Sequence, residues 1–182
     1  MPQIVILAGP NGAGKSTAAS ELLSQEITFL NADEIAKSLS AVPARPAPVK
    51  ARRLLLSHLN ELQSRCQDIA IETTLASRTL APRIERLQRE GYRFDLYFFW
   101  LPSVEMAIQR VALRVFSGGH DIPEPVTRRR YDAGLNNFFS LYQRLANLWR
   151  IYDNTQLAEP SLVAKGTLRI QQAVLWEQIK KG

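Results

Sequence analysis

The sequence predicts an α/β protein of three layers, in which helices cover both faces of a mostly parallel central sheet. Two observations support this prediction. Short apolar runs alternate along the chain with longer amphipathic stretches, as in consecutive βαβ units. The first run, residues 3–8, is almost wholly apolar, which is typical of a strand buried on both faces of a parallel sheet. A length of 182 residues suits one such unit, so we expect a single domain over residues 1–182.

The expected elements follow one another in βαβα order. Runs rich in β-branched and aromatic residues predict strands at residues 3–8, 27–30, 68–72, 94–101, 151–153 and 162–164. Apolar positions at three- and four-residue spacing predict helices at residues 16–24, 49–66, 80–90, 103–117, 123–149 and 173–179. Cys66 lies on the apolar stripe of its helix and is expected in the core. Three prolines within residues 42–48 predict an irregular loop inside the domain.

The strongest motif of the chain lies between the first expected strand and the first expected helix. It reads Gly9-Pro10-Asn11-Gly12-Ala13-Gly14-Lys15-Ser16-Thr17 and fits G-x-x-x-x-G-K-[ST] completely. In such a loop the backbone N–H groups bind the phosphates, the lysine neutralises the β- and γ-phosphate oxygens, and the serine hydroxyl binds Mg²⁺. The motif predicts a P-loop NTPase fold that binds ATP or GTP through this loop, with Lys15 as a catalytic residue and Ser16 as the metal ligand.

Two carboxylates follow expected strands, at the sheet edge that also bears the phosphate loop. Asp33 comes directly after the second strand, where it could accept a proton from an acceptor hydroxyl, help to hold Mg²⁺, or only cap the next helix. Glu72 ends the third strand, in the position that often supports Mg²⁺ and water. Thr73 and Thr74 add hydroxyls suited to a polar acceptor, and a simple turn after the strand is the alternative.

Arginines flank a glycine pair between two expected helices. Arg110 and Arg114 lie four residues apart before Gly118-Gly119, and residues 128–130 are three arginines after it. Guanidinium groups suit the charge that develops around a transferred phosphoryl group, although a solvated basic face is the simpler interpretation of any one arginine. The layout predicts a helical lid over about residues 110–131.

Only part of the 128–130 run can face the nucleotide, because three consecutive helical residues fan through about 200°. Projecting the apolar stripe of this helix back seven residues from Leu135 reaches Arg128. We therefore expect Arg128 to point inward.

The composition and charge of the chain limit the classes of partner that it could bind. The net charge of +6 suits an anionic small molecule or nucleic acid, but the aromatic residues fall on buried stripes, which makes a nucleic-acid partner unexpected. No apolar run approaches the ~20 residues of a membrane helix, and the amino terminus lacks the features of a signal peptide. We expect a cytoplasmic protein whose partners are a nucleoside triphosphate and a small hydroxyl-bearing acceptor.

Taken together, these motifs resemble the zeta-toxin-like family of small P-loop kinases, in particular its short chromosomal members, often labelled predicted ABC-type ATPases. The resemblance covers most of the chain and is specific only when its elements are combined. They are residues 9–17, Asn31-Ala32-Asp33, Glu72-Thr73-Thr74-Leu75, Arg110-Val111, Arg114-Val115, Gly118-Gly119-His120, Ile122-Pro123, Arg129-Arg130-Tyr131 and Tyr152-Asp153-Asn154.

The resemblance implies an ATP-dependent kinase with Mg²⁺ that phosphorylates a sugar hydroxyl, as zeta toxins do on UDP-N-acetylglucosamine. It implies that Asp33 is the catalytic base and that Glu72 contacts the acceptor. It also implies that Arg114, with Arg128 or Arg130 or both, clamps the phosphates. An antitoxin protein is left open as a further partner.

Two other functions are compatible with parts of the sequence. An ABC-like ATPase or regulatory nucleotide-binding module is suggested by the spelling of the loop and by residues 116–120, but the apolar strand ending in Asp-Glu that should follow is replaced by Ile122-Pro123-Glu124-Pro125. A nucleotide or polynucleotide kinase is permitted by the positive charge. The sequence favours the small-molecule kinase.

Overall fold

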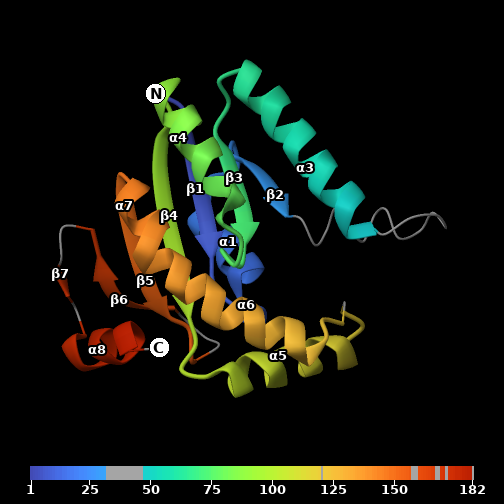
Figure 1. Ribbon diagram of the computed structural model, residues 1–182, viewed down its shortest axis with the longest axis vertical. Coiled ribbons are helices and arrows are strands. Elements are labelled where there is room, and N and C mark those ends of the chain that lie inside the picture. Colours follow the sequence, from blue (N-terminus) through green and yellow to red (C-terminus); the bar gives the residue numbers. More distant parts are fainter. Residues whose placement is uncertain (32–46, 120, 157–159, 167–168, 171, 182) are drawn as a thin grey trace.

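One sheet forms the middle layer of the computed structural model, which describes residues 1–31, 47–119, 121–156, 160–166, 169–170 and 172–181 (Figure 1). Its strand order in this part of the chain is β2-β3-β1-β4-β5-β6-β7. Strands β1 to β5 pair in parallel, and β6 and β7 are antiparallel. The strands are β1 (Gln3–Ala8), β2 (Thr28–Asn31), β3 (Ile69–Thr73), β4 (Arg93–Trp100), β5 (Leu148–Asp153), β6 (Ser161–Lys165) and β7 (Arg169–Ile170). The predicted, mostly parallel sheet is confirmed.

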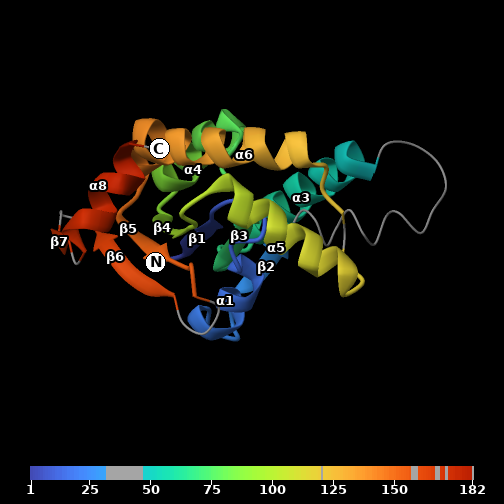
Figure 2. The same cartoon turned by 90° about the horizontal axis from the view of Figure 1, so that it is seen from below.

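Helices form the two outer layers and also cross one end of the sheet. Figure 2 shows α1 on one face and α4 and α6 on the other. The described helices are α1 (Lys15–Leu22), α3 (Ala47–Ser64), α4 (Ala81–Arg89), α5 (Val104–Phe116), α6 (Glu124–Asn137), α7 (Gln143–Leu145) and α8 (Ala173–Lys181), with a 3₁₀ turn at Arg78–Leu80 and a π-helical turn at Phe138–Tyr142. The pair α5 and α6, called the α5–α6 hairpin below, lies beyond the carboxyl ends of the parallel strands (Figure 1).

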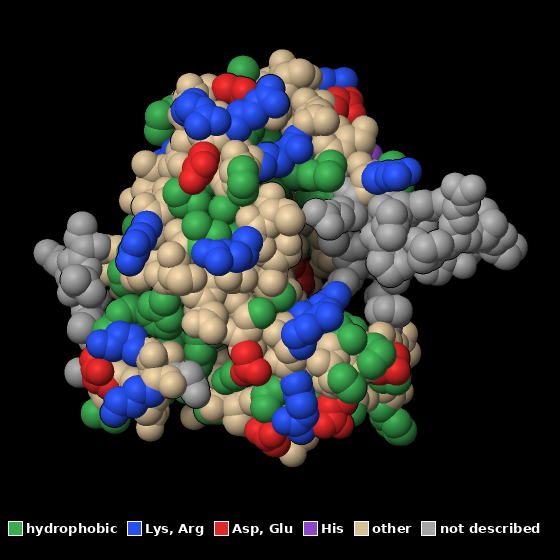
Figure 3. Space-filling model, viewed as in Figure 1, with side chains coloured by type: hydrophobic (Ala, Val, Ile, Leu, Met, Phe, Trp, Pro, Cys, Tyr) green, Lys and Arg blue, Asp and Glu red, His purple; other side chains and the backbone are tan. Residues whose placement is uncertain are grey.

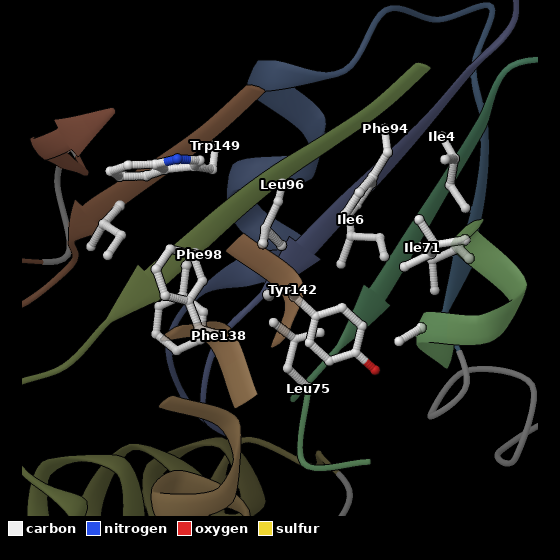
Figure 4. Close-up of a cluster of buried hydrophobic side chains, with 14 of the residues drawn as sticks. Ile4, Ile6, Ile71, Leu75, Phe94, Leu96, Phe98, Phe138, Tyr142 and Trp149 are labelled. Carbon is white, nitrogen blue, oxygen red and sulfur yellow. The ribbon is translucent and has the colours of Figure 1, made fainter. Parts of the chain in front are cut away.

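Strand β1 supplies side chains to both halves of the core. Ile4 and Ile6 join the larger cluster, shown in Figure 4, while Val5 and Leu7 join the smaller cluster under α1. All four are at most 4% exposed. Successive side chains of a strand point to opposite faces, so a strand covered on both sides must be apolar throughout. This is the physical reason for the continuous apolar run at the amino terminus.

The strand register brings the carboxyl ends of β1 and β3 together. Leu7 lies opposite Glu72, and Ala8 lies opposite Thr73. Gly9 then leaves β1 so close to β4 that a Cβ atom there would lie 2.2 Å from the carbonyl oxygen of Phe99. The loop after β1 is therefore fixed between the ends of its two neighbouring strands.

Two expectations about the core are wrong. Cys66 is exposed, because α3 ends at Ser64 and the chain turns at Cys66, with φ of 52°, to enter β3. Trp149 is buried, but it lies on β5 and not on the long helix, because the chain leaves the helical conformation at Ala146. The helical stripe predicted over residues 123–149 stops there.

One helix boundary and the burial of one helix end also differ from the prediction. Helix α3 begins at Ala47, so the last two residues of the predicted 42–48 loop are helical, and residues 42–46 lie outside the described residues. The carboxyl-terminal turn of α5 is more exposed than its apolar stripe predicts: Val115 is 36% exposed and Phe116 is 93% exposed. This turn extends past the described strands of the sheet (Figure 1).

The surface carries mixed charge. On the face drawn in Figure 3, Lys and Arg side chains are spread apart with Asp and Glu among them, without a continuous basic stripe. Among the described helices, none combines the length and the apolar character that crossing a membrane requires.

Candidate functional site

The loop after β1 has the backbone shape of a phosphate cradle. Gly14 adopts the left-handed conformation, with φ of 75°, directly before α1. A Cβ atom at Gly14 would lie 2.6 Å from Nδ2 of Asn154, so a larger residue would also collide with its neighbour. The chain therefore wraps around the amino end of α1, where the backbone N–H groups of the first turn and the helix dipole favour an anion.

Lys15 is buried at the centre of this loop. Its Nζ donates a hydrogen bond to the carbonyl oxygen of Pro10 at 2.8 Å and lies 3.7 Å from Oε1 of Glu72. The side chains of Lys15 and Glu72 are only 5% and 11% exposed. A buried charge needs a partner of opposite sign, and Glu72 supplies it here. The third strand thus places its carboxylate beside the lysine of the loop.

Glu72 also holds two polar side chains through its other oxygen. Oε2 accepts a hydrogen bond from the Ser16 hydroxyl at 2.6 Å and one from Nδ2 of Asn31 at 2.9 Å. The loop, β2 and β3 therefore meet at this one carboxylate. A hydroxyl and a carboxylate are hard oxygen donors of the kind that Mg²⁺ selects, so Ser16 and Glu72 fit the predicted metal.

The turn after β3 is tightened by the first threonine. The Thr73 hydroxyl accepts a hydrogen bond from the backbone N–H of Leu75 at 3.1 Å, and Leu75 adopts a left-handed conformation with φ of 55°. Helix α6 packs closely on this turn, since a Cβ atom at Gly134 would lie 2.3 Å from the carbonyl oxygen of Thr74. The Thr73 hydroxyl thus supports a simple turn after the strand, which was the alternative interpretation of Thr73 and Thr74.

The second candidate carboxylate, Asp33, lies outside the described residues. Strand β2 ends at Asn31, two positions earlier, and Asn31 contacts Glu72. The described end of β2 therefore leads toward the same edge of the sheet.

Of the arginines on α6, Arg130 is the one that reaches the loop. Its Nη1 donates to Oδ1 of Asn11 at 3.5 Å. Arg128 instead pairs with Glu105 and Glu124 on the outside of the α5–α6 hairpin, with its side chain 45% exposed. The expectation that Arg128 points inward is wrong.

The reason is the orientation of α6. Its buried side is centred on Thr127 and Gly134, and Leu135 lies at the edge of that side. A projection that starts from Leu135 therefore continues along the edge of the buried face and reaches the surface at Arg128. The ion pairs then fix Arg128 to the rim of the hairpin.

The two arginines of α5 have different surroundings. Arg110 donates both terminal nitrogens to the carbonyl oxygens of Asn154 and Thr155, each at 2.8 Å. Arg114 lies on the exposed final turns of the helix, beside Gly119, where a Cβ atom would lie 2.6 Å from Cγ of Arg114. Although they are only four residues apart, Arg110 binds the protein backbone and Arg114 lies at the exposed end of the hairpin.

Asn154 belongs to the Tyr152-Asp153-Asn154 motif of the resemblance, which assigned it no role. Its Nδ2 donates to the carbonyl oxygen of Ala13 at 2.7 Å, and the residue is 5% exposed. Its place after β5 is the available signal, because the carboxyl ends of parallel strands share one edge. In the sheet, β3 with Glu72 lies on one side of β1, and β5, which leads to Asn154, lies on the other. Glu72 and Asn154 therefore contact the loop from opposite sides.

Replacing Asn154 with alanine is expected to lower the free energy of unfolding by about 1–3 kcal/mol, because the buried Ala13 carbonyl loses its side-chain donor. Urea unfolding followed by circular dichroism would measure this loss. Asn136→Ala, at an exposed position on α6, is the matched control and should stay within about 0.5 kcal/mol of the parent. Equal stabilities of the two variants would contradict the assigned role.

Comparison with known proteins agrees with this geometry. A sequence model of a family described as AAA domain matches residues 4–141, which include the loop, Glu72 and the α5–α6 hairpin. The chain belongs to this AAA domain family. The AAA domain is a P-loop nucleotide-binding domain. The phosphate cradle at the amino end of α1 agrees with this assignment.

Solved structures share the fold of this AAA domain. AvrRxo1-ORF1:-ORF2 with ATP includes a chain with a TM-score of 0.79 and 19% identity, over 98% of this chain and 63% of that one. A structure from the PezAT chromosomal toxin–antitoxin system of Streptococcus pneumoniae has a TM-score of 0.70 and 17% identity, over 98% of this chain and 78% of that one. A protein proposed to be a kinase, from Chloroflexus aurantiacus, has a TM-score of 0.63 and 15% identity, over 99% of this chain and 97% of that one.

These comparisons confirm the resemblance to zeta-toxin-like P-loop kinases at the level of the fold. The AAA domain described here spans 63% of the AvrRxo1 complex chain that it matches. The shared part is therefore the P-loop fold.

Proposed function

We propose that this protein is an ATP-dependent kinase that transfers the γ-phosphate to a hydroxyl of a small acceptor. The observation that carries the proposal is the position of Glu72, which contacts both Lys15 and Ser16 from the neighbouring strand. A P-loop alone explains nucleotide binding. A carboxylate and a hydroxyl-bearing turn beside it add a surface for a second, polar reactant.

Each residue has a role in this reaction. Lys15 and the N–H groups of the loop bind the triphosphate, and Ser16, supported by Glu72, would hold Mg²⁺, which neutralises phosphate charge when bound. Asp33 accepts the proton of the attacking hydroxyl, and Glu72 with Thr73 and Thr74 orients the acceptor. Arg130 and Arg114 are the candidates for the phosphate clamp. Arg128, which the resemblance offered for the same task, is held outside by Glu105 and Glu124.

The sugar hydroxyl of a UDP-activated amino sugar such as UDP-N-acetylglucosamine is the first acceptor to test, because the sequence motifs resemble those of zeta toxins. The likeness to a structure from a toxin–antitoxin system supports a search for an antitoxin partner. ATP is the first nucleotide to test, since a structural neighbour of the same fold contains it.

The experiment incubates the protein with Mg²⁺, γ-labelled ATP and separate panels of UDP-sugars, sugars, nucleosides and oligonucleotides. We expect label to move to a member of one small-molecule panel. Release of inorganic phosphate with no labelled acceptor would favour the ABC-like ATPase and count against the kinase. Label on oligonucleotides alone would favour a polynucleotide kinase.

A further inference from the structure

Arg110 lies where α5 passes over the P-loop. A Cβ atom at Gly12 would lie 2.9 Å from both the carbonyl oxygen of Ala107 and Cβ of Arg110. The helix backbone therefore rests on the loop at Gly12. From this contact the Arg110 side chain turns toward the segment that follows β5, where it binds the carbonyl oxygens of Asn154 and Thr155.

The same segment returns to the P-loop through a side chain. Asn154 accepts through its carbonyl oxygen from Arg110 and donates through Nδ2 to the carbonyl oxygen of Ala13. Its own N–H donates to the carbonyl oxygen of Trp100 at 3.0 Å, which anchors the segment on β4. Arg110, Asn154 and Ala13 thus form a continuous chain of hydrogen bonds from the hairpin to the loop.

Hydrogen bonds within the segment after β5 also stabilise it. The carboxylate of Asp153 accepts from the N–H of Thr155 at 2.9 Å and from the Thr155 hydroxyl. Burial lowers the pKa of the Arg110 guanidinium, and the nearby Asp153 carboxylate acts in the opposite direction. A guanidinium stays protonated in proteins, so its two donors remain available to the carbonyl oxygens.

We propose that Arg110 is a positioning residue for the nucleotide: acting through Asn154, it holds residues 12–14 in the shape that binds phosphate. The proposal rests on the proposed function of the same loop and assigns Arg110 a task different from the phosphate clamp. Its terminal nitrogens bind backbone carbonyls in the described structure, so its effect on phosphate passes through the loop.

The two tasks predict different kinetics. Loss of an interaction that serves ground-state and transition-state binding alike weakens nucleotide binding and leaves kcat nearly unchanged, whereas loss of a clamp made only in the transition state lowers kcat. For Arg110→Gln we expect the Kd for ADP with Mg²⁺, measured by calorimetry, to rise about 10-fold or more, with kcat for ATP turnover within about 3-fold of the parent.

Three further variants sharpen the test. Arg110→Lys keeps the charge and one donor and should recover part of the ADP affinity. Gln109→Ala, on the exposed neighbouring position, is the control and should bind ADP like the parent. Asn154→Ser combined with Arg110→Gln should weaken ADP binding by less than the product of the single effects, because both residues act in one chain.

Unchanged ADP affinity in folded Arg110→Gln would overturn the proposal, as would a large fall in kcat with unchanged affinity. If circular dichroism shows that Arg110→Gln is unfolded, Arg110→Lys decides: weaker ADP binding in the folded protein supports the proposal, and parental affinity overturns it. ADP binding needs no acceptor, so this result is independent of whether the acceptor panels become labelled.

Discussion

Replacing Lys15 with methionine is expected to lower the rate of ATP-dependent phosphoryl transfer by about 10³-fold. The Lys15 ammonium group lies at the loop after β1. Removing one preorganised donor that stabilises developing charge in a transition state typically lowers kcat by about 10²–10³-fold. Methionine keeps most of the apolar stem of the side chain and removes the ammonium group, with its charge and its hydrogen bond to Pro10. The measurement is the initial rate of ATP consumption with the acceptor found in the panels.

The same change separates catalysis from folding. In Lys15→Met the Glu72 carboxylate loses its charged partner, but we expect it to keep the hydrogen bonds that Ser16 and Asn31 donate. Lys180→Met, which removes an exposed charge on α8, is the control and should keep the parental rate. Parental activity in a folded Lys15→Met protein would show that the loop does not serve phosphoryl transfer.

Asp33→Asn is expected to lower kcat by about 10²–10⁴-fold while leaving ATP affinity close to that of the parent, because an amide cannot take up the hydroxyl proton. Asparagine caps a helix about as well as aspartate does. The substitution therefore preserves the alternative role of Asp33 as a helix cap and removes only the base. The measurements are kcat with a labelled acceptor and the Kd for ATP by calorimetry.

Asp132→Asn, at an exposed position on α6, is the matched control for the change of charge and should keep the parental kcat. Normal turnover of Asp33→Asn would assign Asp33 to capping and require another proton acceptor. Weakened ATP binding without a change in kcat would instead place Asp33 at the metal or nucleotide.

The central part of the site could be predicted from sequence because its determinants are local. A glycine-rich loop between an apolar strand and a helix has few possible conformations, and a carboxylate at the end of a parallel strand must lie at the same sheet edge. The contacts of Glu72 with Lys15 and Ser16 agree with this reasoning. The roles of Asp33 and Arg114 remain predictions.

The remaining contacts depend on packing between distant segments. Asn154 reaches Ala13 across 141 positions of sequence, and Arg110 reaches the same segment across 44. No local pattern distinguishes an arginine that binds phosphate from one that binds a backbone carbonyl. The prediction that Arg128 points inward was also wrong because it depended on packing. A helical stripe shows which residues share a face, but it does not show where the centre of the buried face lies.

Helix α6 joins the loop after β1 to the turn after β3. It contacts the nucleotide loop through Arg130 and is seated on the turn after β3, where Gly134 leaves no room for a side chain and Asn137 binds the carbonyl oxygen of Leu75. A rigid rod that touches both places cannot tilt at one without shifting the other. A shift of α6 at the turn after β3 would therefore also move its contact with the loop after β1.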